Sequence, residues 1–254
     1  MSPVRSPRAA KSRDAPPALV LFDLDETLFD DAYARRRGLA RVRALDPATR
    51  QHPVEWLWEL YGRLLNASHR REVDLGIDAQ TARRERFRQL GKAVGADWSD
   101  ARVQRLVEEY RAAYMRNTRA VPGSARLLDR IRTRAQVGIV TNNRVAEQES
   151  KLDAIGLAHR VDFMVASEGV GVWKPDPAIF RLALKRAQVE AGDAVMIGDV
   201  WEDDVRGAFA AGIRPVWFDR YQRPRPARPP SVEVVRSFVP LEPALRALGF
   251  APTR

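Results

Sequence analysis

The chain has 254 residues, 45% of them hydrophobic, which is enough for one large domain or for one domain with a second inserted into it. It has no cysteine, which excludes disulfides and thiol chemistry. The formal net charge is +10, and no apolar run approaches the roughly 18–20 residues of a membrane helix.

Much of the positive charge lies in two segments that we expect to be unfolded. Residues 1–17 form a basic, Pro-rich lead-in without the apolar region of a secretory signal, and residues 220–230 hold four arginines and no acid. Such segments could attract nucleic acid, but they lack the interleaved aromatic residues that stack on bases. We expect a cytoplasmic protein with no membrane contact, and nucleic-acid binding through these basic segments stays an alternative.

In chain order, the first predicted element is a buried strand over residues 18–23, an apolar run between Pro-Pro and a group of acids. From about residue 30 to residue 118 the apolar residues recur at helical spacing, so four or so helices are expected there, one of them capped by Ser99. Beyond residue 119, short apolar strands alternate with helices. These strands are predicted at 136–141, 161–167, 193–199 and 214–219.

The alternation of strands and helices predicts an α/β fold with a doubly wound parallel sheet. Because the first strand is separated from the others by the helical block, that block is an insertion and not a preceding domain. We therefore expect a Rossmann-like core from residues 18–29 and 119–254, and an all-helical cap from residues 30–118.

Polar side chains follow the predicted strands at their carboxyl ends, where ligands bind in open parallel sheets. They are Asp23 and Asp25 after the first strand, Thr141, Asn142 and Asn143 after the second, Lys174 beyond the third, and Asp199, Asp203 and Asp204 after the fourth. Each has a local alternative, such as capping a helix for the acids or a solvated loop for the lysine. Those alternatives do not explain why all of them fall at one edge of the sheet.

Carboxylates packed together raise one another's pKa unless a cation lies between them. Oxygen ligands without Cys suit Mg²⁺, and His52, His69 and His159 are expected to lie away from this edge, which argues against zinc. Mg²⁺ with one lysine would neutralise a phosphate dianion, and a carboxylate could then attack phosphorus. Since alternate residues of a strand point the same way, Asp23 and Asp25 could serve one centre as nucleophile and as general acid and base.

Four segments together resemble the motifs of the haloacid dehalogenase superfamily. They are "DLDET", the strand-end Thr141, Lys174 within "SEGVGVWKPDPAIF", and "GDVWEDD". The resemblance covers most of residues 18–219 in the right order and spacing, and the helical block resembles the C1-type cap of that superfamily. It implies that Asp23 is the nucleophile, forming a phosphoaspartate, and that Asp25 protonates the leaving group and then activates water.

The resemblance also implies the ligands. Mg²⁺ would be held by the carboxylates of Asp23 and Asp199, the backbone carbonyl of Asp25, and Asp204, with Asp203 as the alternative to Asp204. The phosphate would be bound by Leu24, Thr141, the backbone N–H of Asn142, and Lys174. Dehalogenase members lack an acid at the position of Asp25, so its presence favours phosphoester hydrolysis.

The residues of motifs two to four most resemble those of the nucleotidase and N-acylneuraminate-9-phosphatase branch. The expected protein is a Mg²⁺-dependent phosphatase for a small phosphorylated metabolite, acting as a monomer or homodimer. A phosphomutase, which also keeps both acids, remains an alternative on the same scaffold.

The cap would close over the site and choose the leaving group. Candidate contacts are Arg35, Arg36, Arg37, Trp56, Trp58 and Tyr61. Tryptophans at helical spacing are more typical of a core, however, and the arginine run is typical of a solvated helix face. Trp173, beside Lys174, either shapes the pocket or packs under its loop.

Overall fold

The computed structural model describes residues 16–222 and 232–250, so residues 1–15 and 223–230 of the two basic segments lie outside the described part. Six parallel strands form one sheet in the order β3-β2-β1-β4-β5-β6. The strands are β1 (Leu19–Phe22), β2 (Gln136–Thr141), β3 (Phe163–Ala166), β4 (Ala194–Gly198), β5 (Arg214–Phe218) and β6 (Glu233–Val235). The predicted doubly wound α/β fold is confirmed. β6 is an additional strand that the sequence analysis missed.

The strand order reverses at β1. From β1 the chain moves outward through β2 and β3, then returns to β4 on the other side of β1, where Leu19 is opposite both Gln136 and Ala194. Successive side chains of β1 face opposite sides of the sheet, so Leu21 and Phe22 belong to different hydrophobic clusters. Such a reversal opens a crevice at the carboxyl ends of the two central strands.

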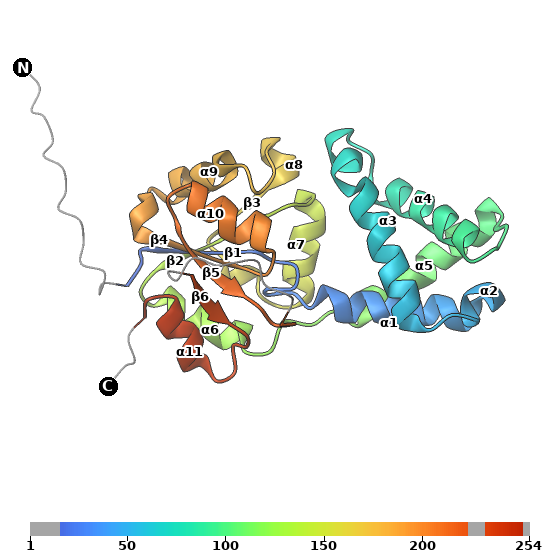
Figure 1. Cartoon of the computed structure of the whole chain (residues 1–254), viewed down its shortest axis with the longest axis horizontal. Helices are drawn as coiled ribbons and strands as arrows, with labels where there is room; N and C mark the ends of the chain where they lie inside the picture. Colours follow the sequence, from blue (N-terminus) through green and yellow to red (C-terminus); the bar gives the residue numbers. More distant parts are fainter. Residues whose placement is uncertain (1–15, 223–231, 251–254) are drawn as a thin grey trace, which may run out of the picture.

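Helices cover both faces of the sheet (Figure 1). On one face lie α9 (Pro177–Ala187) and α10 (Gly207–Ala210), which pack against the cluster that contains Leu19 and Leu21. On the other lie α6 (Ser124–Arg132), α7 (Val145–Ala154) and α11 (Leu241–Ala247), which pack against the cluster of Val20 and Phe22. A short helix, α8 (Ser167–Val170), follows β3. The core therefore fixes β1 from both sides.

Five helices form a unit of their own beside the sheet, on the right of Figure 1. They are α1 (Asp31–Leu45), α2 (Pro47–Arg50), α3 (Val54–Asp74), α4 (Ala79–Ala93) and α5 (Asp100–Arg116), and we refer to them as the helical unit. Ser99 caps α5 by accepting a hydrogen bond from the Arg102 N–H, as predicted. Gly38 lets α1 approach α5, because a Cβ there would lie 2.7 Å from the Tyr110 ring.

The chain crosses between the sheet and the helical unit twice, and the two crossings are tied together. Phe29 forms an isolated bridge with Ala120, and buried Asp30 accepts from Arg119 (2.7 Å) and Arg220 (3.0 Å). Phe29 also packs against Tyr114 of α5. These contacts of Phe29 and Asp30 therefore hold the two crossings next to each other. Among the described residues, no helix is long and apolar enough to cross a membrane.

Candidate active site

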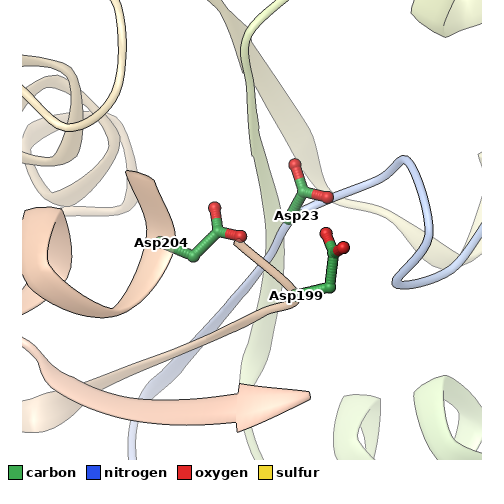
Figure 2. Close-up of side chains that lie close together, drawn as sticks. All are labelled: Asp23, Asp199 and Asp204. Carbon is green, nitrogen blue, oxygen red and sulfur yellow. The ribbon is translucent and has the colours of Figure 1, made fainter. Parts of the chain in front are cut away.

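Three buried carboxylates meet at the carboxyl ends of β1 and β4 (Figure 2). They belong to Asp23, Asp199 and Asp204, and each offers an oxygen within 4.8 Å of the others. Asp23 follows β1 directly, and its N–H still bonds to Ile197 O (2.9 Å), so the sheet fixes its position. Asp204 lies on the single helical turn Trp201–Arg206, and the absence of a side chain at Gly198 leaves room for its carboxylate.

Lys174 lies between two of these acids. Its Nζ donates to Asp23 Oδ1 (2.7 Å) and to Asp204 Oδ1 (2.6 Å). Burial raises the pKa of Asp23 to about 7, with Lys174 opposing the rise and Asp204 adding to it. Burial alone would lower the pKa of Lys174, but Asp204 and Asp23 more than offset this, so its pKa lies above the usual value. Two of the three carboxylates, those of Asp23 and Asp204, thus share one ammonium group.

Asp25 lies apart from this cluster and is held by α7. Lys151 Nζ donates to its two carboxylate oxygens at 2.6 and 2.8 Å, and Gln148 Nε2 donates at 3.1 Å. The Asp25 side chain is 32% exposed, whereas Lys151 is buried. The sequence analysis missed both α7 residues. Their only signal was the three-residue spacing that places two polar side chains on one helix face.

The remaining predicted residues surround the cluster. Thr141 is buried and its Oγ accepts from Gln148 Nε2 at 2.6 Å. Asn142 holds the loop that carries Lys174, which we call the lysine loop. Its side chain accepts a hydrogen bond from the Lys174 N–H (2.7 Å) and donates one to the Lys174 carbonyl (2.9 Å). Leu24 is fully buried, and its carbonyl closes the turn by accepting from the N–H groups of residues 28 and 29.

Asp203 does not join the three carboxylates. Its Oδ2 accepts from the Asn142 Nδ2 at 3.2 Å, whereas its neighbour Asp204 accepts from Lys174 and from the Val200 N–H (2.9 Å). Of the two acids of the fourth motif, Asp204 is therefore the one placed beside Asp23 and Asp199.

A cavity of about 700 Å³ lies between the sheet edge and the helical unit, with Asp25 and Asp199 among its lining residues. Of the six candidate cap contacts, four line it: Arg35, Arg36, Trp58 and Tyr61. The Arg36 guanidinium lies 4.0 Å from the centre of the Trp58 ring, and Arg35 pairs with Asp31. The expectation of a solvated arginine face is therefore wrong for Arg35, whose side chain is only 19% exposed.

The expectation that all three histidines lie away from the site is wrong for His69. This residue lines the cavity, and its Nε2 lies 3.3 Å from the Asn142 carbonyl oxygen. His69 lies in the second half of α3, a helix that continues to Asp74 and so reaches the sheet edge. There Trp173 packs edge-on against His69 and donates to Asp74 Oδ1 at 2.8 Å. Trp173 thus joins the lysine loop to the helical unit.

Comparison with known proteins identifies the same superfamily. Residues 17–212 match the family of haloacid dehalogenase-like hydrolases. The chain is 34% identical to a phosphoserine phosphatase of Thermus thermophilus, over 85% of this chain and 94% of that protein. It is 38% identical to the pyrimidine 5′-nucleotidase YjjG of Escherichia coli, over 42% of this chain and 48% of that protein.

A solved structure has the same fold. The magnesium-bound HAD-hydrolase YfnB of Bacillus subtilis superposes with a TM-score of 0.70 at 21% identity, covering 91% of this chain and 99% of that one. The predicted superfamily is confirmed, whereas the branch within it stays a prediction. With a match over most of its length and the same sheet, the chain belongs to the haloacid dehalogenase-like hydrolase family.

Proposed function

We propose that the protein is a Mg²⁺-dependent phosphatase that hydrolyses a small phosphomonoester through a phosphoaspartate on Asp23. One observation carries the proposal: Asp23 and Asp25 are held by different partners, Asp23 among acids with Lys174 and Asp25 by Lys151 at the cavity. Two carboxylates with different partners can take different roles, one as the nucleophile and the other as the group that transfers a proton. The related phosphoserine phosphatase supports hydrolysis of a phosphomonoester.

The donor set suits Mg²⁺. Asp23, Asp199 and Asp204 supply hard oxygen atoms close to one another, which are the ligands that Mg²⁺ prefers. The backbone carbonyl of Asp25 would complete the protein's share of the ligands. When bound, Mg²⁺ would offset the charge of the acids and of the phosphate, which lets a carboxylate and a phosphate dianion approach.

In the first half-reaction, an Asp23 carboxylate oxygen attacks phosphorus and the bond to the leaving oxygen breaks. Asp25, in its protonated form, gives its proton to that oxygen, so the product leaves as a neutral alcohol. The Lys174 ammonium stabilises the carboxylate before attack and the phosphoryl oxygens afterwards. The Thr141 hydroxyl and the backbone N–H groups of Leu24 and Asn142 would hold those oxygens in place.

In the second half-reaction, the Asp25 carboxylate takes a proton from water, which attacks the phosphoaspartate. Inorganic phosphate leaves, and the Asp23 carboxylate is restored. Lys151 and Gln148 position Asp25 for both steps by fixing its two oxygens. The cavity volume of about 700 Å³ is compatible with a leaving group the size of a small metabolite.

The test is phosphate release by the purified chain from a panel of phosphomonoesters that includes p-nitrophenyl phosphate. We expect turnover with Mg²⁺ and none with EDTA. If no member of the panel loses phosphate in the presence of Mg²⁺, the proposal is wrong. Isomerised product without net phosphate release would instead indicate the phosphomutase.

A further inference from the structure

Arg144 is a buried cation that forms no ion pair in the described part of the chain. It follows the Asn142–Asn143 loop, is only 8% exposed, and lines the cavity. Its Nη2 donates to the Ile77 carbonyl at 2.8 Å. Within residues 16–222 and 232–250, its guanidinium forms no ion pair with any carboxylate. Buried charges are normally paired, so this position calls for an explanation.

Five other cations of the cavity have carboxylate partners, whereas Arg36 lies over the Trp58 ring. The pairs are Arg35 with Asp31, Lys151 with Asp25, Arg86 with Glu72, and both Arg83 and Arg111 with Glu147. Glu147 alone serves two guanidinium groups, each at 3.1 Å. The cavity lining thus holds seven Lys and Arg side chains against five Asp and Glu side chains.

Arg86 adds a second unused donor. This residue is 4% exposed, and its buried Nε has no hydrogen-bond partner among the described residues, although Nη1 pairs with Glu72. Burial lowers the pKa of Arg144, Glu72 opposes this, and repulsion from Arg86 adds to the lowering. Burial and the charges of the same two arginines also lower the pKa of His69. These groups are thus close neighbours. Glu72 offsets part of their mutual repulsion, and a further anion in the cavity would relieve the rest.

We propose that Arg144 and Arg86 form a subsite for a second anionic group, a carboxylate or a phosphate, carried by the alcohol that the enzyme releases. The inference rests on the proposed function and names its substrate class. Arg144 is two residues from Asn142, whose N–H is expected to hold the transferred phosphate, so one small molecule can reach both places. A guanidinium binds either oxyanion through two parallel hydrogen bonds, and burial strengthens them.

The test compares matched substrates with the wild-type enzyme and Mg²⁺. Phosphoglycolate is paired with ethyl phosphate for the carboxylate, and propane-1,3-diol bisphosphate with 3-hydroxypropyl phosphate for the second phosphate. A charge-assisted pair contributes about 1.5–3 kcal/mol, so we expect kcat/KM to favour the acidic member of one pair by roughly 10- to 100-fold. The pair that shows the preference identifies the anion.

Variants assign the preference to the subsite. Arg144→Gln should reduce the acidic-to-neutral ratio by roughly 10-fold or more, and Arg144→Lys should restore part of it, because a point charge replaces the planar fork. Arg63→Gln, an exposed arginine of α3, should leave the ratio unchanged. The ratio for the wild-type enzyme and for Arg144→Lys decides the matter even if Arg144→Gln does not fold.

Equal kcat/KM values for the acidic and neutral members of both pairs, with p-nitrophenyl phosphate turned over, would overturn the subsite alone. A preference that survives in Arg144→Gln would also overturn it. Failure to turn over any substrate, p-nitrophenyl phosphate included, would overturn the proposed function and the subsite together.

Discussion

At the scale of single residues, the Asp23 carboxylate is subject to opposing influences. Burial and the nearby Asp204 disfavour its charge, and Lys174 favours it, with the net result that its pKa rises to about 7. A fold optimised only for stability would not keep a third acid at this position. The free-energy cost of burying this charge is explained if the carboxylate attacks phosphorus and a divalent cation offsets its charge.

This cost predicts how stability changes with pH. The pKa of Asp23 is about 7 in the folded protein and about 3.8 as a model value, so between these values the folded state binds the extra proton. Without metal, the free energy of unfolding should therefore fall as pH rises from about 4 to 7 and stay low above it. Asp23→Asn should remove this dependence and be more stable than wild type at pH 8 by about 1–4 kcal/mol.

Urea denaturation in EDTA measures the difference. Asp153→Asn, at an exposed acid of α7, is the control and should track the wild type. The difference between Asp23→Asn and wild type should vanish near pH 4. A variant that is less stable than wild type at pH 8 without metal would show that the charged Asp23 stabilises the fold.

At the scale of elements, the close contact between β4 and the turn Trp201–Arg206 fixes the position of Asp204. A Cβ at Gly198 would collide with the Asp204 carboxyl group. Gly198→Ala should push that carboxylate out of the cluster and weaken Mg²⁺ activation by roughly 10-fold or more, since one metal ligand moves.

The Mg²⁺ concentration for half-maximal phosphatase activity measures this effect. Gly192→Ala is the matched control, because a Cβ there meets no atom within 4 Å. Equal Mg²⁺ requirements for both variants would contradict the placement of Asp204 as a ligand.

How far the sequence predicted the elements depended on their apolar pattern. The strand at 136–141 was predicted with the observed bounds, because an apolar run in a parallel sheet is continuous. β6 is the outermost strand of the sheet and has only three residues, which are too few to show an apolar pattern. Lys151 and Gln148 were missed because polar residues on a helix normally face solvent, and only the packing of α7 against the first loop turns them toward Asp25.

At the scale of the whole molecule, the site needs the sheet and the helical unit in contact. The Trp173 hydrogen bond to Asp74 and the pairing of Arg83 with Glu147 join them at the cavity. The sequence predicted the acids of the sheet edge through their motifs. It did not predict that Arg86 and Arg144 line the same cavity. The two residues lie on different units and are far apart along the chain.

The contact between the two parts predicts an effect on substrate binding. Trp173→Phe keeps an aromatic ring but removes the hydrogen bond to Asp74, which contributes about 0.5–1.5 kcal/mol to the contact between the two parts. We expect KM for a small phosphomonoester to rise by roughly 2- to 10-fold, with a smaller change in kcat. Trp56→Phe, at a ring stacked on His52 away from this contact, should change neither. A changed kcat with an unchanged KM would place Trp173 in the chemical step instead.

The central claim is that Asp23 carries the phosphoryl group. Rapid acid quenching of the enzyme during turnover with Mg²⁺, followed by mass spectrometry of its peptides, tests it directly. We predict one added phosphoryl group on the peptide that contains Asp23, none in Asp23→Asn, and loss of turnover by roughly 1,000-fold or more in that variant. Turnover at the wild-type rate by Asp23→Asn, with no phosphorylated peptide in either protein, would contradict the account.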